Sequence, residues 1–248
     1  MTKPQKPKET TGEMIRSFLF AILIALVFRS LAYEPFHIPS GSMLSTLYEG
    51  DYIFVSKLSY GYSRFSFPLG LKMFEGRALE TLPERGDVAV FRLPSNTHVD
   101  YIKRIVGLPG DRIQVKKGRL FINDVAVEVV RDGDVSVPDA QGNMRTIARY
   151  KETLPNGRQH IILDEIQNGP ADNTPIYTVP EGHYFVMGDN RDNSQDSRYE
   201  KLVGFVPLEN MIGRADLVFL SFDTATPIWK IWQWPNAFRN DRWVKSIH

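Results

Sequence analysis

The chain has 248 residues, of which 42% are hydrophobic and 24% are charged, and its formal net charge is +1. This composition is that of a folding sequence with a sizeable core, and the charge gives no electrostatic reason to bind nucleic acid. The absence of cysteine excludes disulfides, thiolate metal sites and cysteine nucleophiles. The five histidines are scattered without ligand spacing, so we expect no metal site, and the sequence indicates no cofactor.

An apolar run at residues 17–28 lies between Arg16 and Arg29 and follows a polar, lysine-bearing start. Extended to 17–33, the segment has 17 residues, the lower end of the length that a spanning helix needs. We predict a single transmembrane anchor at 17–33, with the tail 1–16 in the cytoplasm and the rest of the chain on the outer side. A cleavable signal peptide and a buried core helix are the alternatives, although Arg29 stands where small residues should prepare a cut.

Beyond the anchor, the chain has the pattern of short β-segments between turn signals. Pro35, Pro39 and Gly41 exclude a helix directly after the anchor. Strands are expected at 51–62, 87–91, 98–107, 111–115, 119–123, 125–130 and 183–190, and two more between 203 and 222 around a short helical turn.

A more polar stretch, 131–177, contains Asp-Gly and Asn-Gly turns yet keeps strand patterns. We interpret it as an inserted β subdomain that separates two parts of one domain, 34–130 and 178–248. The predicted fold is therefore mainly β: an N-terminal transmembrane helix followed by antiparallel sheets with one insertion.

The first candidate for chemistry is the turn Ile38-Pro39-Ser40-Gly41-Ser42-Met43. Serine beside glycine and proline usually marks a surface turn, and that interpretation explains the composition by itself. The turn is, however, flanked by apolar residues, and a serine in an apolar cleft is a better nucleophile than one in a solvated loop. Ser42 is therefore a candidate nucleophile.

A serine nucleophile needs a base, and none of the histidines lies in a setting that suggests a triad. A lysine can serve if burial lowers its pKa from about 10.4 far enough to leave it neutral. Lys103 is the best-placed lysine, because strand alternation puts Tyr101 and Ile105 on its own face. The alternative is a half-exposed strand lysine whose stem alone is buried.

The third candidate is the polar loop Gly188–Arg198, which follows an apolar strand pattern. By itself it fits a solvated turn or a calcium loop, but it lacks the oxygen spacing and the final glutamate of an EF-hand. Asp196 and Arg198 are an obvious ion pair within it, so the loop can position other groups.

Five segments together resemble bacterial type I signal peptidase, the leader peptidase family of Ser-Lys proteases. In the family's order, they read IPSGSM at 38–43, GDYIFVSK at 50–57, RGDV at 85–88, DYIKRIVGLPGD at 100–111 and GDNRDNSQDSR at 188–198. The resemblance implies a serine endopeptidase of the bacterial cytoplasmic membrane. Its expected substrates are exported preproteins with signal peptides that end in small residues of the Ala-x-Ala type.

The resemblance also implies the roles of individual residues. Ser42 would be the nucleophile and Lys103 the general base, while the Ser40 hydroxyl and the Ser42 N–H would form the oxyanion hole. Residues that support the base and its loop would be Ser194, which orients Lys103, and the pair Asp196 and Arg198. The small pockets for the substrate would be built by Phe36, Ile38, Met43, Leu47, Tyr101 and Ile102.

One position departs from the family pattern, because Ser45 stands where the family usually has proline. We expect a somewhat looser turn and no loss of function. Two other functions remain open: a self-cleaving Ser-Lys protein of the repressor type, which would need an N-terminal DNA-binding domain, and a membrane-tethered β-domain without catalysis. Residues 65–69 and the cluster Trp229, Trp232 and Trp234 are expected either to enter the membrane interface or to pack as ordinary aromatics.

Overall fold

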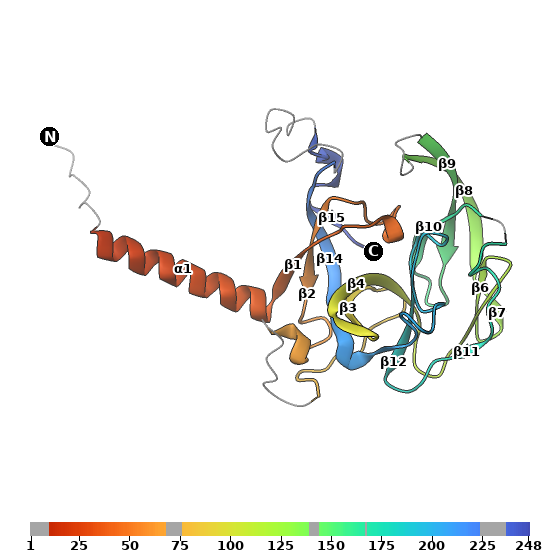
Figure 1. Cartoon of the computed structure of the whole chain (residues 1–248), viewed down its shortest axis with the longest axis horizontal. Helices are drawn as coiled ribbons and strands as arrows, with labels where there is room; N and C mark the ends of the chain where they lie inside the picture. Colours follow the sequence, from red (N-terminus) through yellow and green to blue (C-terminus); the bar gives the residue numbers. More distant parts are fainter. Residues whose placement is uncertain (1–9, 68–75, 139–143, 167, 224–236) are drawn as a thin grey trace.

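The computed structural model describes residues 10–67, 76–138, 144–166, 168–223 and 237–248. Figure 1 shows helix α1 standing away from a body of β-strands, which it joins at β1. The expected tryptophan cluster at 229–234 and residues 68–69 lie outside the described residues.

Helix α1 runs from Thr11 to Leu31. A capping box starts it: Glu13 N–H donates to Thr10 Oγ1, and Thr10 N–H donates to Glu13 Oε2 at 2.8 Å. The helix ends where the chain enters β1, whose first residue, Tyr33, pairs with Ser56. It therefore differs from the predicted anchor 17–33 at both ends, because the capping box starts it earlier and strand pairing ends it sooner.

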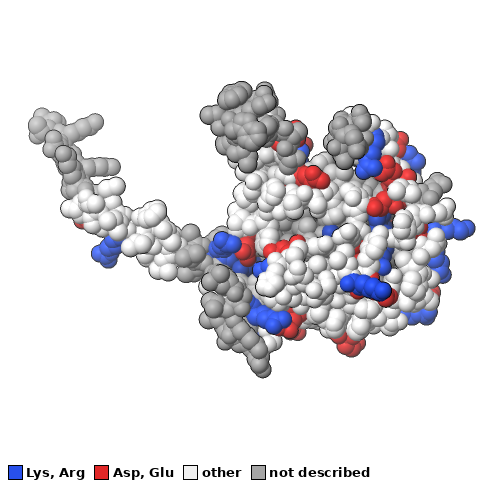
Figure 2. Space-filling view, viewed as in Figure 1, with Lys and Arg blue, Asp and Glu red and all other residues white. Residues whose placement is uncertain are grey.

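The described side chains of α1 are exposed on all sides of the helix, and Phe18, Phe20 and Leu23 are 66%, 62% and 56% exposed. Figure 2 shows few charges along its length. Among the residues that the structure describes, however, none of the helices reaches the combined length and apolar character that crossing a membrane requires. At the junction with the body, Arg29 and the buried Lys57 both form ion pairs with Glu34, each at 2.9 Å.

The main sheet has eight strands among the described residues, in the order β1-β2-β14-β3-β4-β12-β13, with β15 paired to β14. The pairs are antiparallel. The strands are β1 (Tyr33–His37), β2 (Asp51–Ser56), β3 (Val88–Leu93), β4 (Asn96–Gly107), β12 (His183–Met187), β13 (Val206–Pro207), β14 (Met211–Ser221) and β15 (Lys245–Ser246). Pro35 is accommodated because β1 is an edge strand. The strand predicted at 51–62 ends at Ser56, where the Lys57 N–H bonds Ala32 O instead.

Two smaller antiparallel sheets complete the described body. One has the order β10-β9-β8, with β8 (Glu128–Pro138), β9 (Met144–Thr153) and β10 (Gln159–Asp164). The other has the order β11-β5-β6-β7, with β5 (Arg112–Lys116), β6 (Arg119–Ile122), β7 (Val125–Ala126) and β11 (Tyr177–Thr178). The mainly β, antiparallel fold is thus confirmed. The three-stranded sheet β8, β9 and β10 lies in the chain between β4 and β12 of the main sheet, so we name it the inserted sheet; it begins three residues before the predicted insertion 131–177.

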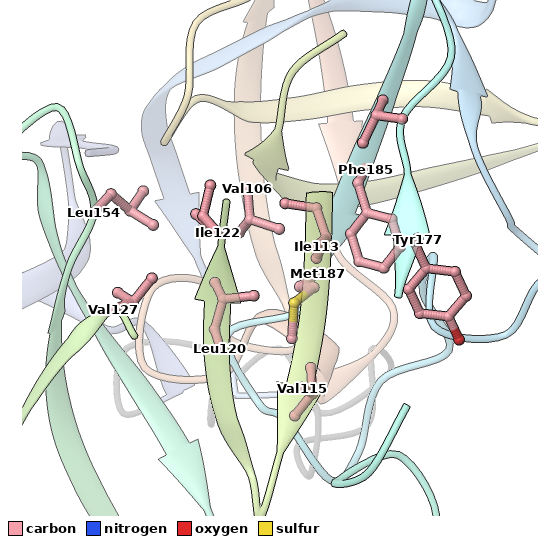
Figure 3. Packing of buried hydrophobic residues seen from close by; sticks show 11 residues of the cluster. Val106, Ile113, Val115, Leu120, Ile122, Val127, Leu154, Tyr177, Phe185 and Met187 are labelled. Atoms are coloured by element: carbon pink, nitrogen blue, oxygen red, sulfur yellow. The ribbon is translucent and has the colours of Figure 1, made fainter. Parts of the chain in front are cut away.

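Apolar clusters join the sheets. Figure 3 shows the cluster in which β5 and β6 pack against β12, with Ile113 and Leu120 facing Phe185 and Met187. A second cluster lies at the other end of the main sheet, around Ile53 and Val218. Single 3₁₀ turns occur at η1 (Gly41–Met43), η2 (Arg64–Ser66), η4 (Leu208–Asn210) and η6 (Asn240–Arg242).

Candidate active site

The turn η1 carries Ser42, which is 7% exposed. Its backbone is held by the loop that follows β12: Asn190 N–H donates to Ser42 O at 3.1 Å, and Asn190 Nδ2 donates to Gly41 O at 3.0 Å. A main-chain and a side-chain bond from one asparagine thus fix the peptide units on both sides of the Ser42 α-carbon. The serine lies in a braced turn and not in a solvated loop.

Lys103, near the middle of β4, reaches the same turn. Its Nζ donates to Ser42 Oγ at 2.8 Å and to Ile102 O at 2.9 Å, and it lies 5.2 Å from the centre of the Tyr101 ring. The side chain is almost wholly buried. Burial lowers the pKa of Lys103 from 10.5 to about 8, with a smaller contribution from Arg198, while Asp196 and Asp189 oppose the shift. The predicted Ser42 and Lys103 are therefore in contact.

The loop after β12 supplies an ion pair next to this lysine. Asp196 and Arg198 are buried and joined by two bonds of 2.8 Å. Asp196 also accepts the Gly188 N–H, and Arg198 donates to Arg191 O. The pair thus folds the loop onto itself, as expected from the sequence.

Ser194 is buried on this loop, but no hydrogen bond joins its hydroxyl to Lys103 among the described residues. The expected orienting contact is therefore not formed among the described residues, where Lys103 Nζ bonds Ser42 Oγ and Ile102 O. Ser194 does pack tightly against Gly188: a Cβ on that glycine would lie 2.2 Å from Ser194 Oγ and 2.6 Å from Ser42 O. Gly188 is what allows the loop and the turn to approach this closely.

The buried pair Arg104–Asp189 was not predicted from the sequence. Arg104 donates from Nε and Nη2 to the two carboxylate oxygens of Asp189, both at 2.8 Å, and Thr46 Oγ1 donates to the same carboxylate at 2.5 Å. Arg104 also donates to Gly86 O and His248 O. Through Thr46, this pair links β4, directly after Lys103, to the segment that follows the Ser42 turn. The charged residues at both positions were the only signal in the sequence.

Ser45 has a φ of +88°, a backbone conformation that proline cannot adopt. Its hydroxyl donates to Ile161 O on β10 at 3.0 Å. Ser45 thus makes a hydrogen bond to β10 that a proline could not make, and the expected loosening of the turn stays a prediction. This bond also directs the third hydroxyl of the turn toward β10.

The residues expected to form the substrate pockets divide into two groups. Met43 and Leu47 are fully buried, and Ile38 is nearly so, within the second apolar cluster. Phe36 and Ile102 are partly buried at the margin of that cluster, whereas Tyr101 packs at the margin of a third one.

Ser40, directly before η1, is exposed, and its side chain makes no capping bond. It lies two residues before Ser42 in the chain. Among the described residues, there is no group of three or more His, Cys, Asp or Glu side chains that could hold a metal ion.

A serine hydroxyl hydrogen-bonded to a buried lysine on an antiparallel β scaffold is an arrangement suited to hydrolases with a lysine base. A family model described as signal peptidase, peptidase S26, matches residues 11–220. The chain therefore belongs to the S26 signal peptidase family, and it is a peptidase.

Two Rickettsia relatives agree with this assignment. The chain is 41% identical to the signal peptidase I of Rickettsia typhi over 98% of its own length and 96% of the relative. It is 44% identical to that of Rickettsia felis over 93% of its own length and 88% of the relative. A crystal structure of a signal peptidase I from Enterococcus faecalis is 30% identical, covers 54% of this chain and 97% of that one, and has a TM-score of 0.33.

Proposed function

We propose that the chain is a serine endopeptidase that removes signal peptides from exported preproteins, with Ser42 as nucleophile and Lys103 as general base. The observation that carries the proposal is the 2.8 Å contact between Lys103 Nζ and Ser42 Oγ in a buried setting. Family membership and the names of the relatives, signal peptidase I, support the choice of substrate.

In the proposed mechanism, neutral Lys103 accepts the Ser42 proton as Ser42 Oγ attacks the scissile carbonyl carbon. The Ser40 hydroxyl and the Ser42 N–H donate to the oxyanion, and one such donor typically contributes about 2.7–4 kcal/mol. Lys103 then gives its proton to the leaving amine, which departs with the mature protein. Water, deprotonated by Lys103, hydrolyses the acyl-enzyme and releases the signal peptide.

The proposed substrates have signal peptides that end in small residues of the Ala-x-Ala type. Phe36, Ile102 and Tyr101 are the predicted pocket residues with exposed surface, and the buried Met43 and Leu47 would form the floor beneath them. A shallow pocket on a close-packed floor rejects large side chains because overpacking is destabilising.

We also propose that α1 tethers the enzyme to the bacterial cytoplasmic membrane as a single-pass anchor, with its N-terminus in the cytoplasm and the catalytic domain (34–130 and 178–248, with the insertion 131–177) outside. Support comes from the apolar side chains exposed around α1, which are costly to leave in water. A chain that starts at Ala32 should leave the membrane fraction and still cleave a short peptide. Recovery of that chain in the membrane fraction would contradict the tether.

Two variants test the chemistry. Ser42→Ala and Lys103→Ala should each abolish cleavage of a preprotein by the detergent-solubilised enzyme, while both proteins keep the wild-type circular dichroism spectrum. Ser95→Ala is a matched control, since it removes a serine hydroxyl that is bonded to a backbone carbonyl, Leu202 O, in the turn between β3 and β4. Full activity of either Ser42→Ala or Lys103→Ala would overturn the mechanism.

A further inference from the structure

Strand β10 of the inserted sheet lies beside the loop that braces the nucleophile. Leu163 N–H donates to Asp189 O at 2.8 Å, and Arg191 N–H donates to Leu163 O at 2.9 Å. Between these two residues, Asn190 N–H points the other way and donates to Ser42 O. Residues 189–191 thus behave as a short strand with β10 on one side and the nucleophile turn on the other.

The nucleophile turn also contacts the inserted sheet directly. Ser45 Oγ donates to Ile161 O, as described above. Leu44 packs against an apolar cluster made by Val137, Ile147 and Leu163, one residue from each strand of the sheet. The turn is therefore held by the inserted sheet through both a polar and an apolar contact.

A buried polar cluster lies under these contacts. Glu152 on β9 is 0% exposed and accepts from Arg191 Nη1 at 3.0 Å and from Nη2 at 2.5 Å. His160 on β10 places Nε2 at 3.2 Å from Glu152 Oε2 and 3.9 Å from Asp189 Oδ1. Asp189 in turn is paired with Arg104. The cluster connects the inserted sheet to β4 at the residue next to Lys103.

The charges of this cluster balance without a contribution from histidine. Two carboxylates, Glu152 and Asp189, each have an arginine partner, and burial together with Arg104 lowers the pKa of His160. A neutral His160 then fills the space between the two ion pairs. Buried ion pairs are weak evidence for stability, since apolar residues of similar volume often serve as well. The cluster is, however, bonded to β4, which carries Lys103, and to the loop that holds the Ser42 turn. This position suggests a role in placing the two residues and not in stability.

We infer that Glu152 and His160 are positioning residues, through which the inserted sheet fixes residues 189–191 and thereby the distance between Ser42 Oγ and Lys103 Nζ. Neither residue has a contact with Ser42 or Lys103 among the described ones, so they act only through Asp189, Asn190 and Arg191. The inference rests on the proposed role of Ser42 as nucleophile. It assigns the inserted sheet a part in the chemical step and none in substrate binding.

The first test is His160→Ala in the full-length, detergent-solubilised enzyme, assayed on a preprotein with an Ala-x-Ala cleavage site. We expect kcat to fall roughly 10- to 100-fold with KM unchanged, because a misplacement of about 1 Å at a reacting pair has effects of that size. His160→Gln, which keeps a polar side chain at this position, should recover part of the loss. Gln159→Ala is the matched control, because it changes the adjacent, exposed position on β10. It should retain wild-type kcat.

A second variant distinguishes a loss of positioning from a loss of folding. Glu152→Ala alone would leave the Arg191 charge buried without its partner, so Glu152→Met combined with Arg191→Met removes both charges and keeps the volume. The double variant should unfold at a temperature close to wild type and still show the reduced kcat. Arg145→Ala, which breaks an exposed ion pair with Glu165 on the same sheet, should leave kcat unchanged.

Wild-type kcat in both His160→Ala and the double variant would overturn the inference, as would a rise in KM with kcat unchanged. That failure is distinct from failure of the proposed function. If Ser42→Ala is inactive while His160→Ala is fully active, only the positioning role is lost. If Ser42→Ala still cleaves the preprotein, the proposed function itself is wrong.

Discussion

The amine of Lys103 and the hydroxyl of Ser42 are hydrogen-bonded at 2.8 Å, although the two residues are 61 positions apart in the chain. The two residues meet because Asn190 holds the Ser42 turn, while β4 carries Lys103 through a buried part of the main sheet. The same burial that brings them together lowers the pKa of the lysine. Burial in the main sheet therefore both places Lys103 beside Ser42 and lowers its pKa.

The first prediction concerns pH. With a Lys103 pKa of about 8, kcat/KM should rise about tenfold per pH unit below that value and level off above it, because only the neutral amine accepts the Ser42 proton. Initial rates of preprotein cleavage between about pH 6 and 11 measure this pH dependence. The range includes both the lowered pKa of about 8 and the ordinary lysine pKa of about 10.4. The rising part of the kcat/KM profile is called its limb. A limb that levels off only near the ordinary lysine pKa would contradict a base whose pKa is lowered by burial.

Gly188→Ala should inactivate the enzyme by steric conflict. The added methyl group would lie 2.6 Å from Ser42 O, a backbone atom, and 2.2 Å from Ser194 Oγ. Since backbone cannot rotate out of the way, the turn must move, and we expect a loss of roughly 100-fold in kcat. Gly12→Ala is the control, because a Cβ there has nothing within 4 Å. Wild-type turnover by Gly188→Ala would show that the loop and the turn are less tightly packed than described.

Ser45→Pro should damage this enzyme although proline is usual in the family at this position. The φ of Ser45 is +88°, whereas proline requires about −65°, so the turn would have to refold at a penalty of roughly 3 kcal/mol. Ser45→Ala removes only the bond to Ile161 O and should lose about 1 kcal/mol. Urea unfolding of the two variants measures the difference. Equal stability of the two would mean that residue 45 does not keep this φ in solution.

Some of the site could be predicted from the sequence, and the contrast between neighbouring residues shows why. Alternation along a strand depends only on local geometry, so it placed Lys103 on the face of Tyr101 correctly. The partner of Arg104 could not be found in this way, because Asp189 lies far away in the chain and pairs only after β4 and β12 have met. The role of Ser45 depends on a backbone angle that its residue type does not favour.

In the fold, too, local features could be predicted from the sequence and long-range pairing could not. Turn signals and apolar patterns predicted antiparallel β-structure and an inserted β subdomain, and three antiparallel sheets are present among the described residues. The start of α1 could also be predicted in principle, since Thr10 and Glu13 have the spacing of a capping box, although the apolar run at 17–28 indicates a later start. The assignment of strands to separate sheets was not legible, because it depends on long-range pairing.

The last prediction uses Asp196 to separate electrostatics from packing. Among the charged groups, its carboxylate is the strongest influence that raises the pKa of Lys103, whereas Arg198 lowers it. Asp196→Asn should therefore shift the pH limb of kcat/KM to lower pH, because the variant loses the anion that favours the ammonium form and leaves the Arg198 cation unopposed. It should also lose about 3–5 kcal/mol of stability, since a buried charge is left without its partner.

Two comparisons make this prediction specific. Asp196→Asn combined with Arg198→Met removes both influences, so its limb should lie closer to wild type than that of the single variant. Asp134→Asn breaks an exposed pair with Arg131 and should change stability by less than about 0.5 kcal/mol, with no shift of the limb. In Asp196→Asn, a limb that stays in place or moves to higher pH would mean that Lys103 is not the titrating base. The loss of a nearby negative charge can only lower the pKa of a lysine.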